Sequence, residues 1–419
     1  MSEHFLLALS SIIILGIGAQ WLAWRLKLPS ILLLLLFGFI AGPLSGFLNP
    51  DELIGDILLP IVSIAVALIL FEGGLSLKIK ELPKIGGALL FLLTFGVTIT
   101  GVITAIAAYT ILGFNWQISI LLGAILVVTG PTVISPLLRH IRPKRKVADI
   151  LKWEGIVIDP IGALFALLVF EAILIGGFEE ASISGLIVIG KTILFGSLVG
   201  FSFGWLLIIL IKRFWIPDFL QETVTLSLVV GAFVCSNFFQ HESGLFATTL
   251  MGIAMANQKQ VTVKRILEFK ENLSVLIISF LFIILSARLD LTVFKNLSYT
   301  SLLFLLVLIL IARPLAVFVS TIKSEFTLKE KIFLSWMAPR GIVAAAVASI
   351  FALRLSEKNI PQTEFIVPIT FIVIVGTVAL YGLTAAPVAR YLKVAQSNPQ
   401  GVLMVGGHTW ALELAKVLK

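Results

Sequence analysis

The chain alternates between long apolar runs and short polar connections. A helix needs about 20 consecutive apolar residues to cross a membrane, and thirteen segments approach or exceed that length. These segments lie near residues 5–24, 29–48, 53–75, 85–112, 116–138, 151–176, 183–211, 219–239, 243–257, 271–289, 297–320, 329–353 and 364–392. The pattern therefore predicts an all-α membrane protein with about 13 transmembrane helices in a single domain over residues 1–393.

The composition supports a membrane location. Hydrophobic residues make up 59% of the chain and charged residues 13%, whereas a soluble domain is about half apolar and about a quarter charged. The net charge of +8 could indicate nucleic-acid binding, but the basic residues lie in short connections rather than on one helix face. The single cysteine, Cys235, excludes both a disulfide framework and a thiol-based metal site.

Basic residues concentrate in every second connection. The basic connections contain Arg25 and Lys27; Lys78, Lys80 and Lys84; Arg139, Arg142, Lys144, Arg145, Lys146 and Lys152; Lys212 and Arg213; Lys259, Lys264 and Arg265; Lys323, Lys329 and Lys331; and Arg390 and Lys393. Cytoplasmic loops of membrane proteins are enriched in Lys and Arg. We therefore expect these connections in the cytoplasm of a cell (inner) membrane protein, with the N-terminus outside and the C-terminus inside. An even number of spans would break the alternation.

Two of the thirteen segments contain helix-breaking residues near their middle. The fifth carries Gly130 and Pro131, and the twelfth carries Pro339 and Gly341. Proline lacks the N–H donor and crowds the preceding turn, so each helix is predicted to unwind there. Two such segments in comparable positions are typical of an inverted repeat whose broken helices cross at the substrate site. The alternative is a pair of ordinary proline kinks.

The sixth segment places two carboxylates in the membrane, Glu154 and Asp159. Five residues of helix separate them by about 140° around the axis and about 7.5 Å along it, so they face different partners. We expect Arg340, at the second break, to form a structural ion pair with Glu154. Asp159 would then have no permanent partner, so a proton and a metal cation could compete for it. The alternative is that Asp159 pairs with Arg313 or Arg340 and only holds helices together.

Three further residues are secondary candidates. Thr129, beside the first break, can offer a hydroxyl and a freed carbonyl to a small cation, or it can simply bond back to its own helix. Glu72, at the end of the third segment, is either a carboxylate bonded to a helix end or part of the ion path. Arg313, which precedes Pro314, is predicted to be a paired structural arginine.

These residues together resemble the monovalent cation:proton antiporter family, the sodium/proton exchanger branch with thirteen spans. The resemblance covers about residues 5–393 and depends on LFEGGL around Glu72, TGPT around Thr129, WEGIVIDPIG around Asp159, Arg313–Pro314 and APRG around Arg340. It implies that Asp159 binds the ion and the proton, that Glu154 and Arg340 form an ion pair, and that Thr129 and Glu72 lie in or beside the cation site. It also implies a homodimer in which a core domain moves against a dimerisation domain.

The chain departs from the family pattern at three positions near Asp159. Ile158 stands where the family usually has asparagine or a second aspartate, Gly130 where an acidic residue is frequent, and Gly155 where serine is common. Several oxygen ligands are therefore missing, which leaves sodium and potassium both open as the transported cation. With one titrating carboxylate, the resemblance implies electroneutral, one-for-one exchange.

The segment 394–419 reads as a strand, a glycine-containing turn and the start of a helix. It resembles the opening of a nucleotide-binding regulatory (TrkA-N-like) domain of the kind attached to potassium transporters. Gly406 and Gly407 are followed by His408 and Ala411, so the glycine fingerprint is imperfect. We expect a truncated cytosolic domain with no bound nucleotide.

Three classes of function compete on the sequence alone. Exchange of a monovalent cation (Na⁺ or K⁺, with Li⁺ as a further candidate) for H⁺ fits the lone aspartate best, including the variant of a K⁺/H⁺ antiporter regulated by a nucleotide-binding domain. An organic-anion carrier on a similar fold would need more polar ligands. A membrane enzyme is disfavoured, because the four histidines are scattered and no catalytic dyad is evident. No resident cofactor is expected, since the cation and the proton are cargo.

Overall fold

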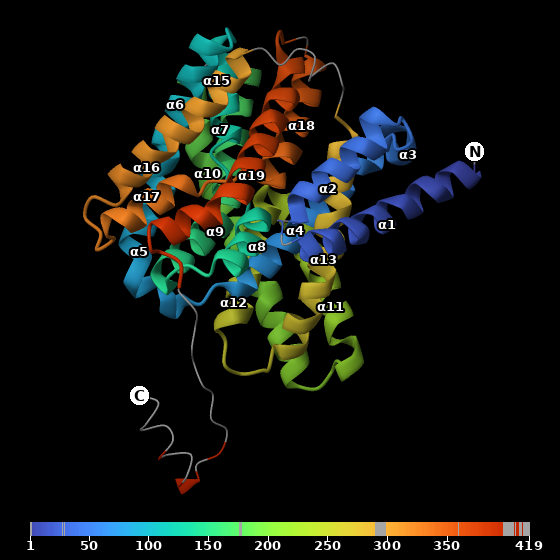
Figure 1. Ribbon diagram of the computed structural model, residues 1–419. Coiled ribbons are helices and arrows are strands. Elements are labelled where there is room, and N and C mark those ends of the chain that lie inside the picture. The colour runs from blue at the N-terminus through green and yellow to red at the C-terminus, as the bar shows by residue number, and fades with distance from the viewer. Residues whose placement is uncertain are drawn as a thin grey trace.

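The computed structural model describes residues 2–26, 28, 30–175, 178–289, 299–358 and 360–396, together with residues 406, 408, 409 and 413. Within these ranges the regular elements are helical (Figure 1), and one isolated antiparallel bridge joins Pro143 to Ala395. The α-helices are α1 (Ser2–Leu26), α2 (Ser30–Phe39), α3 (Pro50–Ile54), α4 (Leu58–Ser76), α5 (Leu82–Phe91), α6 (Val97–Ile111), α7 (Trp116–Ile125), α8 (Pro131–Ile141), α9 (Arg145–Ile175), α10 (Phe178–Lys212), α11 (Gln221–Phe239), α12 (Ser243–Asn257), α13 (Lys264–Ala287), α15 (Tyr299–Val307), α16 (Arg313–Ser320), α17 (Leu328–Trp336), α18 (Ile342–Ser356) and α19 (Ile366–Tyr391).

Helices occupy each of the thirteen predicted segments, and seven in the described ranges are long and apolar enough to cross a membrane. Two of the remaining segments are interrupted. The fifth segment is divided into α7 and α8, and the twelfth into α17 and α18. Three π-helical segments, Ile40–Leu44, Leu92–Gly96 and Leu308–Ala312, distort further helices without breaking them.

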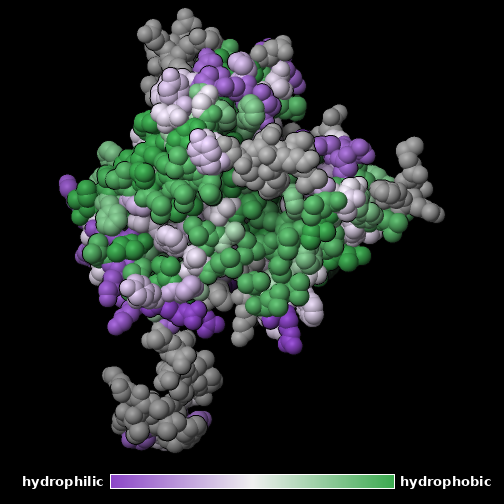
Figure 2. Space-filling view, turned by 45° about the horizontal axis from the view of Figure 1, so that its top comes forward, coloured by the Kyte–Doolittle hydropathy of each residue, from purple (hydrophilic) through white to green (hydrophobic). Residues whose placement is uncertain are grey.

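One face of the molecule carries the band of apolar residues expected of a membrane protein. Figure 2 shows hydrophobic residues spread across the middle of the visible face, with hydrophilic residues gathered above and below. Large apolar side chains project outward from many helices: Trp24 on α1 is 75% exposed and Leu198 on α10 is 62% exposed. Contact between these apolar side chains and lipid is not unfavourable, whereas their exposure to water would raise the free energy of the folded protein.

Small residues let the helices on one side of the molecule approach each other closely. A Cβ on Gly74 of α4 would lie 2.4 Å from the Thr249 carbonyl oxygen of α12, and a Cβ on Gly252 would lie 2.2 Å from the Phe71 oxygen. Without a hydrophobic driving force inside lipid, helices associate through this kind of close packing. Helices α4 and α12 therefore form a tight pair beside the helices that carry the site.

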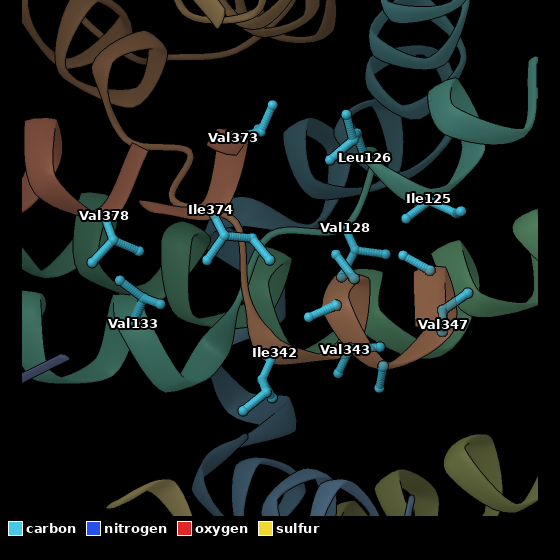
Figure 3. Packing of buried hydrophobic residues seen from close by; sticks show 14 of the residues in the cluster. Ile125, Leu126, Val128, Val133, Ile342, Val343, Val347, Val373, Ile374 and Val378 are labelled. Atoms are coloured by element: carbon cyan, nitrogen blue, oxygen red, sulfur yellow. The ribbon is translucent and has the colours of Figure 1, made fainter. Parts of the chain in front are cut away.

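Aliphatic side chains surround the two interrupted helices. Figure 3 shows Val128 and Val133 flanking the first interruption, Ile342 and Val343 following the second, and Ile374 on α19. All five are buried in the largest apolar cluster of the protein. Such close packing holds the backbone of the interruptions in place.

The predicted nucleotide-binding-like segment 394–419 lies almost entirely outside the described residues.

Candidate ion-binding site

The first interruption separates α7 from α8. Helix α7 ends at Ile125, residues 126–130 are non-helical, and α8 begins at Pro131. Proline suits this first helical position, because its missing N–H would have no partner there and its φ angle is already helical. The predicted break at Gly130 and Pro131 is present, and residues 126–131 are buried.

The second interruption contacts the first directly. Helix α17 ends at Trp336 and α18 begins at Ile342, so the predicted break at Pro339 and Gly341 is also present. The Gly130 N–H donates to the Pro339 carbonyl oxygen over 2.9 Å. A Cβ on Gly130 would lie 2.3 Å from the Gly341 Cα. Only glycine at this position therefore allows the two interrupted segments to approach so closely.

Arg340 stabilises the broken end of α7. Its Nη1 donates to the carbonyl oxygens of Val127 and Val128 at 2.9 and 3.2 Å, and its backbone N–H donates to Thr377 Oγ1 at 3.2 Å. The carbonyls at a helix C-terminus lack intrahelical partners and carry partial negative charge. The buried Arg340 guanidinium donates hydrogen bonds to these carbonyl oxygens, and its positive charge offsets their partial negative charge.

The predicted ion pair between Glu154 and Arg340 is wrong. Glu154 pairs instead with Arg313, whose Nη1 and Nη2 donate to the two carboxylate oxygens, the second over 2.9 Å. Arg313 also donates to the carbonyl oxygens of Leu334 and Met337 at the end of α17. Arg340 is engaged by α7 on the other side of the break, so Arg313 is the guanidinium that reaches Glu154. Arg313 is thus paired, as predicted. The carbonyl groups at the end of α17 accept hydrogen bonds from Arg313, and those at the end of α7 accept them from Arg340.

Asp159 faces the first interruption. Gly155, Asp159 and Gly162 lie at helical positions i, i+4 and i+7, which share one face of α9. A Cβ on Gly155 would lie 3.7 Å from the Pro131 Cα, and a Cβ on Gly162 would lie 3.7 Å from the Val128 Cα. Asp159 therefore lies between these contacts, at the level of Thr129 and Gly130.

Three oxygen atoms at this place are buried without a partner. Asp159 is 0% exposed and Thr129 is 2% exposed. Neither Asp159 carboxylate oxygen, nor Thr129 Oγ1, has a hydrogen-bond partner among the described residues. Buried polar groups in proteins are nearly always satisfied, so these oxygens are candidates to bind a transported ion. Carboxylate and hydroxyl oxygens are the hard donors that alkali cations prefer.

Glu72 lies in a polar cavity next to this place. It accepts a hydrogen bond from Ser274 Oγ and lines a cavity of about 230 Å³ together with Pro131, Ser135 and Arg139 of α8. Pro131, which lines this cavity, also packs against Gly155 on the face of α9 that carries Asp159. Within the described ranges, no three His, Cys, Asp or Glu side chains gather as they do around a transition metal.

Two contributors were missed from the sequence. Thr377 on α19 accepts the Arg340 N–H, and Ser274 on α13 donates to Glu72. Each lies in a long apolar segment that contains other Ser or Thr residues, so no local signal distinguishes it.

A membrane-embedded helical protein with two interrupted helices in contact, opposite a buried carboxylate, has the architecture of a secondary transporter. The chain belongs to the sodium/hydrogen exchanger family, whose transmembrane-region model matches residues 9–391.

Several known proteins are similar to the chain. A K⁺/H⁺ antiporter, NhaP of Alkalimonas amylolytica, is 29% identical over 404 residues, which are 94% of this chain and 68% of that protein. Na⁺/H⁺ antiporter 1 of Methanocaldococcus jannaschii is 29% identical, with 87% of this chain and 88% of that protein covered. The solved structure of the sodium proton antiporter MjNhaP1 from that organism at pH 8 has a TM-score of 0.80 at 26% identity, covering 93% of this chain and 99% of that one.

Proposed function

We propose that the protein is a secondary active antiporter that exchanges a monovalent cation for protons by alternating access, with Asp159 as the shared binding group. Its relatives are Na⁺/H⁺ and K⁺/H⁺ antiporters and not enzymes. The cation and the proton are both cargo, and the mechanism requires no resident cofactor.

One observation carries the proposal: Asp159 is buried opposite the first interruption, and neither of its carboxylate oxygens has a hydrogen-bond partner among the residues that the structure describes. A buried ionised carboxylate without compensation is strongly unfavourable, so the group must bind either a proton or a cation. The two species therefore compete for one place. Cation and proton then cross the membrane in opposite directions as the protein alternates between inward- and outward-facing states.

The remaining parts of the proposed site have supporting roles. Thr129 adds a hydroxyl oxygen beside Asp159, and the Glu72 cavity supplies a polar approach from the end of α8 that carries Arg139. The Glu154–Arg313 pair neutralises its own charge and leaves Asp159 as the titrating acid. Exchange through a single acid would be electroneutral, one cation for one proton.

The proposed topology follows the thirteen predicted segments. They would form an inverted repeat in which the α7–α8 and α17–α18 pairs cross, with the N-terminus outside the cell membrane and the C-terminus in the cytoplasm. The exposed apolar face of α1, together with family membership, supports a homodimer in which a dimerisation domain holds the core domains. Segment 394–419 would belong to a cytosolic regulatory region.

Ion flux in proteoliposomes tests the function. Wild-type protein should collapse an imposed pH gradient when Na⁺ or K⁺, and in a parallel series Li⁺, is added to the outside, and the series identifies the transported cation. Asp159→Asn should abolish the response to every cation while the protein elutes and melts like wild type. A response retained by Asp159→Asn would refute the role given to this residue, and wild-type protein inert to all three cations would refute exchange itself.

A further inference from the structure

The connection between α8 and α9 is paired with a short segment that follows α19. This segment, Val394–Gln396, is called the C-terminal strap below. The Lys144 N–H donates to the Val394 carbonyl oxygen, and the Gln396 N–H donates to the Arg142 oxygen, each over 2.9 Å. Val394 is 1% exposed and belongs to the largest apolar cluster. The strap is thus anchored both by its backbone and by a buried side chain.

Unusual backbone conformations direct the two segments toward each other. Arg142, at the end of α8, has a φ of 50°, and Lys393, just before the strap, has a φ of 56°. Both angles lie in the left-handed region that non-glycine residues rarely adopt. Each residue lies at the C-terminal end of a helix, where a left-handed residue commonly ends the helix and turns the chain away from its axis.

The same connection is also tied to the second interrupted helix. Lys144 Nζ lies 4.0 Å from Glu330, which caps the first turn of α17, and Lys146 Nζ lies 3.3 Å from Glu325. Lys146 additionally lies 4.6 Å from the centre of the Phe326 ring. The segments that precede α9 and α17 are therefore joined at one junction, and the strap is its third member.

We propose that the C-terminal strap is a positioning element of the exchange site. It holds the connection that joins α8, which begins at the first interruption, to α9, which carries Asp159. By fixing these two helix ends relative to each other, the strap sets the separation of Thr129 from Asp159. The proposal rests on the exchange function proposed above and extends it, because changes at the C-terminal end of the chain would reach the site by this route.

A single backbone hydrogen bond tests the proposal. Gln396→Pro removes the N–H that donates to Arg142, at an exposed side chain and after a residue that is already extended. Gln396→Ala keeps the N–H and serves as the matched control. In full-length protein in liposomes, Gln396→Pro should raise the half-saturating cation concentration roughly two- to tenfold, the effect of losing one hydrogen bond. Gln396→Ala should match wild type, and Gln396→Pro should melt in detergent at most about 4 °C below it.

A reversible crosslink supplies the second arm. Pro143 and Ala395 form a non-hydrogen-bonded antiparallel pair, a geometry with Cα atoms about 4.5 Å apart that a disulfide can join. Pro143→Cys with Ala395→Cys, in a Cys235→Ala background, should exchange normally when oxidised. Adding Gln396→Pro to this background should give the raised half-saturating concentration under reduction and the wild-type value after oxidation.

The outcomes separate the strap from the exchange function. If wild type exchanges but Gln396→Pro is unchanged, or oxidation fails to rescue it, the strap does not position the site. If oxidation of the double-cysteine protein alone stops exchange and reductant restores it, the strap must open during transport, and the proposal is overturned even if Gln396→Pro fails to fold. If wild type itself does not exchange, the proposed function fails instead.

Discussion

At the residue scale, the buried arginines Arg313 and Arg340 bind different partners, and neither of them pairs with Asp159. Arg313 neutralises Glu154 and binds carbonyls at the end of α17, whereas Arg340 binds carbonyls at the end of α7. Both arginines thus compensate the C-terminal ends of interrupted helices. Asp159 is the carboxylate that faces the interruption without either of them.

Replacing Arg313 should destabilise the protein through the loss of its ion pair with Glu154, an effect that replacing Arg340 should not have. Arg313→Met leaves a buried carboxylate without its partner, a change that costs about 3–5 kcal/mol, and it should lower the melting temperature sharply in detergent. A double-mutant cycle with Glu154→Gln should give a coupling energy of roughly 0.5–3 kcal/mol. The same cycle with Arg340→Met should give much less. Stronger coupling to Arg340 would contradict the observed pairing.

Thr129→Val should weaken cation binding without weakening the fold. The hydroxyl has no described protein partner, and valine has nearly the same shape. Losing a ligand to a charged species should raise the half-saturating cation concentration roughly tenfold or more. Thr370→Val on α19 is the control, because among the described residues its hydroxyl bonds to the Ile366 oxygen of its own helix and to no other group. Equal effects on cation affinity from the two variants would remove Thr129 from the site.

At the element scale, the interrupted helices depend on glycine at their point of contact. Gly130 and Gly341 approach so closely that a Cβ on either would lie 2.3 Å from the other's Cα. Backbone atoms at this distance cannot move aside as a flexible side chain can. The contact therefore fixes the relative position of the two breaks, and with it the shape of the place that Asp159 faces.

Gly341→Ala should force the breaks apart and lose most exchange activity. Overpacking of this kind costs about 1–3 kcal/mol, so we expect a lower melting temperature as well as a lower maximal rate. Gly87→Ala on α5 meets open space and should be neutral or slightly stabilising, since alanine favours the helix. Wild-type exchange by Gly341→Ala would show that the contact is not required.

The two interruptions could be predicted from local sequence, but the arginine that pairs with Glu154 could not. Glycine and proline act on their own turn, so Gly130, Pro131, Pro339 and Gly341 indicated the breaks from the sequence. The partner of Glu154 depends on which of two arginines the packing brings near, and Arg313 and Arg340 both precede or follow a proline in an apolar segment. Thr377 and Ser274 acquire their roles only through tertiary contact.

At the scale of the whole molecule, the apolar belt and the polar ends set how the protein lies in a membrane (Figure 2). Helix α1 extends from the body of the protein and exposes most of its apolar face (Figure 1). The alternation of basic and non-basic connections then predicts which end faces the cytoplasm. Because the chain has a single cysteine, Cys235, replacing it gives a cysteine-free background in which introduced cysteines can be labelled to determine the orientation.

Two exposed positions on either side of α4 report the orientation. In a Cys235→Ala background, Glu52→Cys should react with a membrane-impermeant maleimide in intact cells, and Lys80→Cys should react only after permeabilisation. Both side chains are exposed, so burial does not confuse the result. The reverse pattern would invert the topology, and equal labelling of both would mean that α4 does not cross the membrane.

The measurement that bears most directly on the mechanism is proton release on cation binding. Adding the transported cation to purified, weakly buffered protein should acidify the solution by one proton for each cation bound, because both species occupy Asp159. Asp159→Asn should neither bind the cation with comparable affinity nor release protons. Cation binding without proton release in wild type, or undiminished binding and release in Asp159→Asn, would contradict competition at this carboxylate.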